Sequence, residues 1–473
     1  MRPTLLAGLS LALLCAGAQA ATPTSRFTFD PYPSTYRALA APPLLIRQAT
    51  VLVGDGRRLD NADVLVENGR ISAIGTGLAA PAGATVVEAG GKWVTPGIID
   101  VHSHLGVYPS PGVKAHSDGN EMTSPVTANV WAEHSIWAQD PGFHAALAGG
   151  VTSLQILPGS ANLVGGRGVT LKNVPATSYQ AMKFPGAPWG LKMACGENPK
   201  RVYGGKSGPA TRMGNVAGYR AAFIDAAEYL KKNAPRSQAP KRKRWWERAS
   251  GGDAPDSGGD AGGKRDLKLD TLAGAINGEI LVHIHCYRAD EMATMLDLAK
   301  EFGFKVAAFH HGVEAYKLAD RLAQENVCGA LWADWWGFKM EAFDGIQENI
   351  ALVDRPAGGC AIVHSDSDEG IQRLNQEAAK VMANARRAGM GEIAPERAIR
   401  WLTGNAARAL GVQEQTGTLE AGKMADVVVW NQNPFSVYAR AEQVYIDGAR
   451  VYDRHDPSRR PKSDFLLGQE VAP

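Results

Sequence analysis

Residues 94–106 read VTPGIIDVHSHLG, and this stretch decides the fold that we expect for the chain. It is an apolar run typical of a buried strand, and it ends in His102, Ser103 and His104. Side chains two residues apart on a strand point the same way, so the two imidazoles could bind one ion together. Taken alone, the pair also fits two hydrogen-bonded histidines that close an ordinary strand.

Short strand-like segments lie before this stretch and again near the end of the chain. Residues 44–95 contain LLIRQATVLV, ADVLVENGRISAIG and ATVVEAGGKWV, with Asn68-Gly69 as a tight-hairpin signal. Residues 416–455 contain MADVVVW and EQVYIDGARVY, with a second hairpin turn at Asp447-Gly448. We therefore predict one small composite β-sandwich domain, formed by 44–95 as its first part and 416–455 as its second.

Residues 96–415, between these two parts, alternate short apolar strands with amphipathic helices, the pattern of parallel βα units. The candidate strands are GIIDVHSH, GVTSLQIL, GVTLKNV, GLKMACGE, EILVHIHC, FKVAAFHH, VCGALWAD and CAIVHSD. This pattern predicts an α/β fold, a (β/α)8 TIM barrel. An open doubly wound sheet is the alternative, but no Gly-x-Gly-x-x-Gly turn follows a strand.

Residues 233–265 interrupt this alternation. The basic segment KRKRWW is followed by SGGDAPDSGGDAGG, which is polar and of low complexity. The formal net charge of the whole chain is only +2, so neither a nucleic acid nor an anionic membrane is indicated as a partner. We therefore expect a flexible, solvated insertion.

Residues 1–20 have the features of a cleaved secretory signal peptide. Arg2 precedes an apolar run, Leu5 to Leu14, that is too short to span a bilayer comfortably. Ala18-Gln19-Ala20 is a small-x-small cleavage pattern. We therefore expect a periplasmic or secreted protein, and no later segment resembles a membrane span.

Four cysteines follow this leader: Cys195, Cys286, Cys328 and Cys360. They are widely spaced, contain no Cys-x-x-Cys pair and lie in apolar segments, so we expect four buried thiols. Cys328 and Cys360 start neighbouring predicted strands, and an oxidising compartment would permit a bridge between them.

Polar side chains end several of the predicted barrel strands. Because the carboxyl ends of the strands of a (β/α)8 barrel meet on one rim, these side chains should lie together. Imidazole nitrogens and carboxylate oxygens suit Zn²⁺ and similar divalent ions. The sequence therefore predicts a metal site on this rim, formed by His102, His104, Glu197, His285, His311 and Asp366.

The chain resembles the metal-dependent amidohydrolase superfamily, in particular its exported imidazolonepropionase-like and prolidase-like members. The matching segments are VTPGIIDVHSH, GGVTSLQILPGSANLVGGRG, GLKMACGENPKRVYG, VHIHCYRADEM, HHGVEAYKLADRLA, IVHSDSDE, AIRWLTGNAARALGV and GTLEAGKMADVVVW. The resemblance implies a distorted (β/α)8 barrel with a composite β-sandwich. It also implies one or two divalent metal ions, with Zn²⁺ as the expected element.

The resemblance assigns ligands strand by strand, beginning with the His-x-His pair of the first strand. The fifth-strand ligand is His285, with His283 as its rival, because HCYRADE fits the family's motif. The sixth-strand ligand is His311, in which case His310 points away into packing. The eighth strand supplies Asp366 as a metal ligand and catalytic residue.

The fourth-strand ligand is left open between two residues. Many members of the family carry a CO₂-modified lysine that bridges two metals, and Lys192 in GLKMACG fits that pattern. Other members use a glutamate, and Glu197 lies at the predicted strand end. We favour Glu197 slightly, and a carboxylated Lys192 is the alternative that would give a binuclear centre.

The resemblance implies hydrolysis of C–N bonds in a small amide, dipeptide or cyclic amide. A metal-bound hydroxide would be the nucleophile, and Asp366 would carry its proton to the leaving nitrogen. Arg288 and Tyr203 are candidate substrate-binding residues, and Arg288 could equally form a salt bridge at a helix start. The alternatives are a deaminase or lactonase on the same barrel and a non-catalytic binding protein. We also expect a homo-oligomer.

Overall fold

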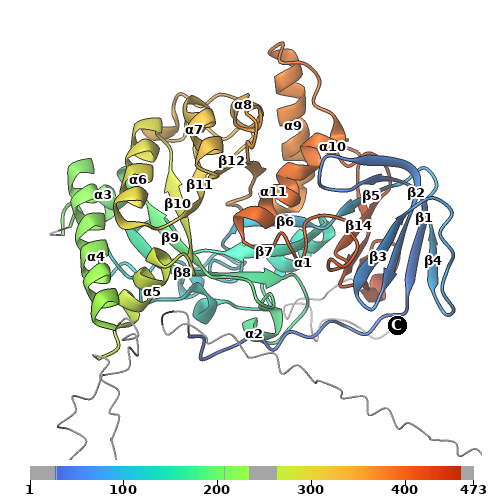
Figure 1. Ribbon diagram of the computed structural model, residues 1–473, viewed down its shortest axis with the longest axis horizontal. Helices are drawn as coiled ribbons and strands as arrows, with labels where there is room; N and C mark the ends of the chain where they lie inside the picture. The colour runs from blue at the N-terminus through green and yellow to red at the C-terminus, as the bar shows by residue number, and fades with distance from the viewer. Residues whose placement is uncertain (1–26, 28, 207, 234–263, 460–473) are drawn as a thin grey trace, which may run out of the picture.

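The computed structural model describes residues 27, 29–206, 208–233 and 264–459. The predicted signal peptide lies outside the described residues, and so does the predicted insertion apart from residues 233, 264 and 265. Two sheets organise the chain: one curls into a barrel, and the other stands beside it (Figure 1). Within the described residues, no helix is both long and apolar enough to cross a membrane.

The barrel sheet has eight strands, and strands that follow one another in the sequence are neighbours in the sheet. Its outer face carries helices, as expected for βα units, so the barrel strands are buried almost throughout. The strands are β6 (Ile98–Ser103), β7 (Val151–Ile156), β8 (Val164–Lys172), β9 (Gly190–Ala194), β10 (Leu281–Cys286), β11 (Val306–His311), β12 (Cys328–Leu331) and β13 (Ala361–Val363).

The third barrel strand departs from the expected parallel arrangement. β8 pairs antiparallel with both β7 and β9, whereas the other neighbouring pairs are parallel. The cause is the connection from β7, which comprises only residues 157–163. A parallel crossover needs a dozen or more residues, so a chain with so short a link must turn back on itself.

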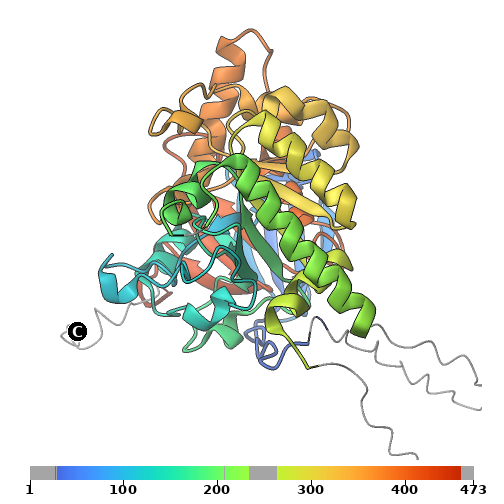
Figure 2. The same cartoon turned by 90° about the vertical axis from the view of Figure 1, so that its left-hand side faces the viewer.

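Helices follow most of the parallel strands and cover the barrel. Figure 2 shows α4 and α6 lying across its outer surface. Sequence signals set several helix ends: Asp140 caps the amide of Gly142 at the start of α1, and Gly303 ends α6 at φ 81°. The helices are α1 (Pro141–Ala148), α2 (Tyr179–Met182), α3 (Glu197–Tyr203), α4 (Arg212–Asn233), α5 (Leu267–Ile276), α6 (Ala289–Phe302), α7 (Ala319–Gln324), α8 (Asn349–Asp354), α9 (Leu374–Arg387), α10 (Pro395–Ala398) and α11 (Gly404–Ala409).

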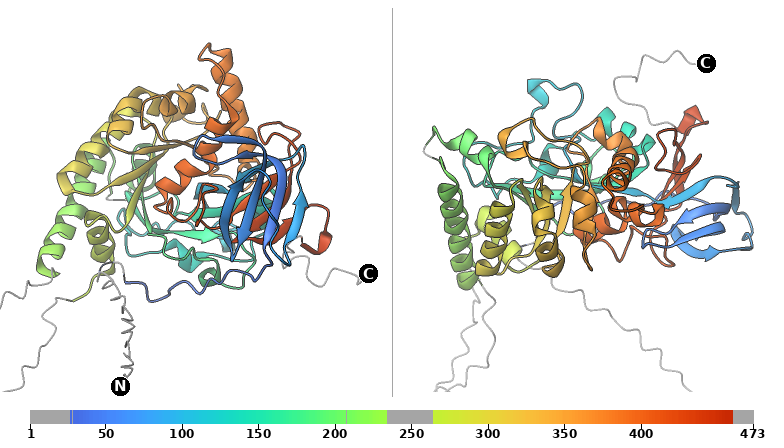
Figure 3. Two further views of the ribbon diagram at one scale, coloured as in Figure 1. Left: turned by 45° about the vertical axis from the view of Figure 1, so that its right-hand side comes forward. Right: turned by 90° about the horizontal axis from the view of Figure 1, so that it is seen from above.

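The second sheet is built from both ends of the described chain, as the hairpin signals predict. It lies at one end of the molecule in Figures 1 and 3 and encloses a small apolar core of its own. The two chain ends meet where β5 pairs antiparallel with β14. The strands are β1 (Leu44–Leu52), β2 (Arg58–Glu67), β3 (Arg70–Gly75), β4 (Thr85–Glu88), β5 (Trp93–Pro96), β14 (Val427–Trp430), β15 (Ala441–Ile446) and β16 (Ala449–Asp453).

A buried ion cluster joins the two sheets. The Lys172 ammonium, on β8, lies 2.9 Å from Asp426 Oδ1 and 3.1 Å from Asp447 Oδ1, both at the ends of the composite sheet's strands. Tyr36 donates a hydrogen bond to Asp447, and Thr416 donates one to Asp426. Removing one member would leave a buried charge without its partner, so this cluster fixes how the two sheets dock.

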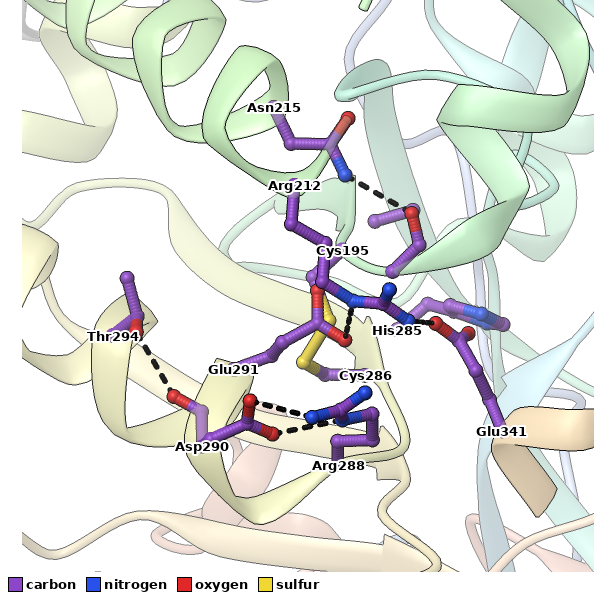
Figure 4. The surroundings of a disulfide bond; sticks show 12 residues. Cys195, Arg212, Asn215, His285, Cys286, Arg288, Asp290, Glu291, Thr294 and Glu341 are labelled. Atoms are coloured by element: carbon purple, nitrogen blue, oxygen red, sulfur yellow. Dashed lines mark hydrogen bonds and ion pairs between the residues drawn. A yellow bond between two sulfur atoms is a disulfide. The ribbon is translucent and has the colours of Figure 1, made fainter. Parts of the chain in front are cut away.

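The expectation of four buried thiols is wrong, because the four cysteines form two disulfides, Cys195–Cys286 and Cys328–Cys360. The second is the bridge that the sequence left open as an alternative. Neighbouring parallel strands bring their Cα atoms to 5.2 and 4.6 Å, within the range that a disulfide spans. The first joins the carboxyl ends of β9 and β10, and the second joins the starts of β12 and β13. Figure 4 shows the first between α4 and the beginning of α6.

Loss of either disulfide should lower the free energy of unfolding by about 2–4 kcal/mol, because each one restricts the unfolded chain. We expect the Cys195→Ala/Cys286→Ala variant to lose about 1 kcal/mol more than Cys328→Ala/Cys360→Ala, since their sequence separations are 91 and 32 residues. Denaturant unfolding of both double variants checks this. Equal stability of the variants and the wild type would contradict it.

Candidate metal centre

The carboxyl ends of the barrel strands bring imidazoles and a carboxylate together. Two overlapping groups of three residues place their nitrogen and oxygen atoms within 4.8 Å of one another. Solvent reaches the cluster from the rim, because the side chains of His104 and Asp366 keep 18% and 24% of their exposure. The groups are His102, His104 and Asp366, and His102, His311 and His364.

The first-strand pair lies beside Asp366. Oδ1 of Asp366 is 3.3 Å from Nε2 of His102 and 3.1 Å from Nε2 of His104. Nδ1 of His104 is 2.9 Å from the carbonyl oxygen of Leu157, which can only accept a hydrogen bond. His104 is therefore protonated on Nδ1 and presents the lone pair of Nε2 to the cluster.

Both histidines at the end of β11 face the cluster, and the expectation that His310 points away is wrong. Strand alternation would turn His310 and His311 to opposite sides. His311 instead has φ 71°, a left-handed backbone that redirects its side chain. His310 Nδ1 lies 2.9 Å from His102 Nδ1, and the turn at His311 brings its ring to 4.8 Å from that of His102 between centroids.

His364 is a member of the cluster that the sequence analysis missed. It follows β13 two residues before Asp366, and its ring stacks on that of His102 at 5.2 Å between centroids. The two-residue spacing that singled out His102 and His104 also occurs in His364-Ser365-Asp366, so the signal was present. Asp366 itself has φ 53°, again a left-handed backbone.

The two histidines of β10 lie at different depths. The His285 ring is 4.6 Å from that of His311 between centroids, and its Nε2 is 3.3 Å from Asn198 Nδ2. His283 lies within hydrogen-bond distance of His310, where its Nδ1 is 2.9 Å from Nε2. His285 is therefore placed among the rim residues, and His283 contacts the cluster through His310.

The structure places the two fourth-strand candidates differently. Lys192 is fully buried on β9, with Nζ 3.3 Å from Nε2 of His102 and 3.0 Å from the Pro158 carbonyl oxygen. Glu197 begins α3, and its carboxylate lies 3.6 Å from the Lys339 ammonium. It is Lys192 that reaches the imidazoles, because a long side chain within the strand points into the barrel.

The two predicted substrate-binding residues are engaged elsewhere. Arg288, immediately before α6, forms two hydrogen bonds with Asp290 and is 42% exposed, as Figure 4 shows beside the disulfide. This is the helix-start salt bridge that the sequence left as the alternative. Tyr203 is buried, and its hydroxyl accepts a hydrogen bond from Asn162 at 2.8 Å.

Burial controls the charges of the cluster. It lowers the pKa of His364 to about 3 and the pKa values of His102 and His311 well below the ordinary value, so these imidazoles are neutral at pH 7. Burial also acts to raise the pKa of Asp366, but its contact with His104 and the positive charge of Lys192 outweigh that effect. The pKa of Asp366 is therefore lowered, and its carboxylate is ionised.

The residues present fit a divalent cation. Nδ1 of His285, Nδ1 of His311 and both ring nitrogens of His364 are buried without a hydrogen-bond partner. Each such atom costs about 1–3 kcal/mol unless something binds it. Neutral imidazole nitrogens beside an ionised carboxylate are the donor set that Zn²⁺ and similar ions prefer.

A distorted (β/α)8 barrel with such a cluster at its strand ends is typical of metal-dependent hydrolases, and the comparisons agree with this class. A family model described as the amidohydrolase family matches residues 364–452. An amidohydrolase from Thermotoga maritima of known crystal structure is 34% identical with a TM-score of 0.74, and the match covers 87% of this chain and all of that one. The chain therefore belongs to the amidohydrolase superfamily.

Two curated relatives match over different lengths. Amidohydrolase tasK of Hapsidospora irregularis is 32% identical over 469 residues, which is 91% of this chain and 46% of that protein. The dihydroorotase of Geobacter sulfurreducens is 39% identical over 127 residues, 25% of this chain and 24% of that protein. The chain thus spans about half the length of the first relative, and only a quarter of the second aligns.

Acid should destabilise the metal-free protein through its buried histidines. Burial lowers the pKa of His283 to about 3, below the value of about 6.5 that an unfolded chain has. The unfolded state therefore binds more protons between these values, and the free energy of unfolding should fall as the pH drops from about 6.5 to 3.

Denaturant unfolding in the presence of a chelator measures this. His283→Gln should reduce the fall in stability between pH 7 and 4, whereas His455→Gln, at a side chain that is 73% exposed, should not change it. An identical pH dependence in His283→Gln and the wild type would contradict the expectation.

Proposed function

We propose that the chain is a metal-dependent hydrolase that breaks C–N bonds in small amides that carry a carboxylate, such as dipeptides and N-acyl amino acids. The observation that carries this proposal is the cluster of His102, His104, His311, His364 and Asp366. Its open nitrogens and ionised carboxylate would hold one or two divalent cations. When bound, such a cation would activate water and polarise the carbonyl oxygen of the substrate.

Asp366 is the group in the cluster that can move a proton. Its carboxylate is ionised, partly exposed and within 3.1 Å of Nε2 of His104. It would accept the proton of the attacking water and return it to the leaving nitrogen, as general acid–base catalysis requires. The left-handed backbone of Asp366 holds its carboxylate toward the imidazoles. The backbone amide of Asp366 also donates a hydrogen bond to the carbonyl oxygen of His102 at 3.0 Å, which fixes this position.

Lys192 has the properties needed for the lysine modification that the family resemblance implies. Burial lowers the pKa of Lys192 to about 8, so a useful fraction of its amine is uncharged near neutral pH. An uncharged amine can add to CO₂, forming a N–C bond and releasing one proton, which gives a carbamate anion. That anion would supply oxygen ligands beside His102 and favour two cations over one.

Lys339 is the residue that we assign to the substrate carboxylate, in place of Arg288. Its ammonium lies 3.0 Å from Asn198 Oδ1 and 4.2 Å from the ring centroid of Tyr287. Asn198 in turn contacts His285 at 3.3 Å, so the positive charge stands at the edge of the cluster. Glu197 lies 3.6 Å from it and balances this charge only loosely.

Action outside the cytoplasm is part of the proposal. Both disulfides are buried in the barrel, and such bonds persist in oxidising compartments. This agrees with the signal-peptide pattern of residues 1–20.

Purified protein should contain about one to two divalent ions per chain by elemental analysis. Chelation should abolish hydrolysis of a library of dipeptides and N-acyl amino acids, and added Zn²⁺ should restore it. Lys192→Gln should lower the metal content of protein prepared with bicarbonate. Full activity of a metal-free preparation would contradict the proposal, and turnover of aminated bases or lactones alone would favour the deaminase or lactonase alternative.

Lys339→Gln should raise KM for carboxylate-bearing amides roughly 10- to 100-fold with little change in kcat, because a hydrogen bond to a charged group contributes about 1.5–3 kcal/mol. The matched control is Arg288→Gln, at an exposed residue already paired with Asp290, which should leave KM unchanged. Steady-state kinetics on each substrate and its carboxamide analogue separate these outcomes. An equal effect on the acid and the carboxamide would show that Lys339 does not bind the carboxylate.

A further inference from the structure

Below the metal centre, the barrel interior contains a continuous chain of hydrogen-bonding side chains. Nδ1 of His102 lies 2.9 Å from Nδ1 of His310, and Nε2 of His310 lies 2.9 Å from Nδ1 of His283. Nε2 of His283 lies 3.4 Å from Nε2 of Gln155. These residues come from β6, β11, β10 and β7, and at most 1% of any of them is exposed.

Each contact between neighbouring side chains in this hydrogen-bond chain can hold only one proton. A neutral imidazole carries one N–H and one lone pair, so in every pair of nitrogens one must donate and the other accept. Choosing the donor at one end therefore fixes every other proton. In one direction His102 donates to His310, His310 to His283, and His283 to the side-chain oxygen of Gln155. In the other direction Gln155 is the first donor, and His102 carries its proton on Nε2.

Only the first direction leaves Nε2 of His102 free for a cation. His104 does not have this ambiguity, because the carbonyl oxygen of Leu157 can only accept. Nδ1 of His102 instead faces an imidazole, which can donate or accept. On the Nδ1 side of His102, the position of the proton is thus decided by the group at the far end of this hydrogen-bond chain.

Gln155 is that group, and it can serve either direction. Its amide offers both a donor and an acceptor, and its Oε1 is buried without a hydrogen-bond partner. The side-chain amide of Gln155 can therefore rotate by a half turn, which brings Oε1 to Nε2 of His283, without breaking a hydrogen bond to that oxygen. Gly190 makes room for the side chains of Gln155 and His283. A Cβ at this position would lie 2.7 Å from Nε2 of Gln155 and 3.1 Å from Cδ2 of His283.

We propose that His310, His283 and Gln155 act as positioning residues, which hold His102 in the Nδ1-protonated tautomer and so prepare its Nε2 to bind a divalent cation. This inference rests on the proposed metal-dependent function and adds to it the residues that tune the first-strand ligand. Partners behind a ligating histidine typically change metal affinity 10- to 100-fold.

Two substitutions of Gln155 test this proposal, because they differ in the direction that they permit. Gln155→Glu supplies a carboxylate, which accepts from His283 and keeps the first direction. Gln155→Met fills similar space but offers no donor there and only a weak acceptor. We expect the Glu variant to keep the Zn²⁺ affinity of the wild type, and the Met variant to bind Zn²⁺ about 10- to 100-fold more weakly.

The first measurement is Zn²⁺ affinity by competition with a chelator, with unfolding curves of each metal-free variant as the check on stability. A merely structural role would make the buried carboxylate of Gln155→Glu at least as harmful as Gln155→Met. The matched control is Gln139→Met, which removes a partly buried glutamine bonded to the Ala176 carbonyl and should leave the affinity unchanged.

The second measurement is the ¹⁵N chemical shifts of selectively labelled histidines in the Zn²⁺-loaded protein. They should show His102 protonated on Nδ1, and His310 and His283 protonated on Nε2. Wild-type affinity in a folded Gln155→Met variant, or a proton on Nδ1 of His283, would overturn this proposal and leave the metal site intact. A wild-type protein that binds no Zn²⁺ would overturn both proposals.

Discussion

The burial of several imidazoles inside the barrel is the constraint on which the rest of the structure depends. A buried nitrogen without a partner costs about 1–3 kcal/mol, so a fold cannot hold many of them without either pairing them or binding something to them. The lower histidines, His283 and His310, are paired with one another and with His102. The upper ones keep open nitrogens on His285, His311 and His364, at the rim that solvent reaches.

Two left-handed residues make this division possible. His311 and Asp366 have φ values of 71° and 53°, a conformation that costs of order 1–3 kcal/mol for a residue other than glycine. At His311 it lets consecutive residues of one strand serve both layers, His310 below and His311 above. At Asp366 it returns the carboxylate to the imidazoles of the first strand. Such local strain is typical of sites where binding requires a fixed geometry.

Much of this arrangement could be predicted from the sequence, because it depends on short-range patterns. The hairpin turns and the apolar runs indicated the barrel and the composite sheet, and the polar strand ends indicated the rim. The direction of β8, the inward turn of His311 beside His310 and the Cys195–Cys286 disulfide could not be predicted in this way. They depend on a short connection, on one backbone torsion and on which strands become neighbours, and these are set by tertiary packing. His364 was within reach, since it has the same spacing to Asp366 that His102 has to His104.

The choice of neutral partners behind His102 has an electrostatic consequence. A carboxylate in that place would add a buried negative charge, and burial already raises the pKa of Asp100 to about 7. Asp100 instead accepts from Ser365 and from the amide of His102, which supports the strand end without contacting an imidazole ring nitrogen. A chain of neutral imidazoles orients His102 and leaves the charge of the centre unchanged. The balance of a bound cation's charge then rests on Asp366 and on whether Lys192 is an amine or a carbamate, so affinity and ion number should depend on that lysine more than on any carboxylate deeper in the barrel.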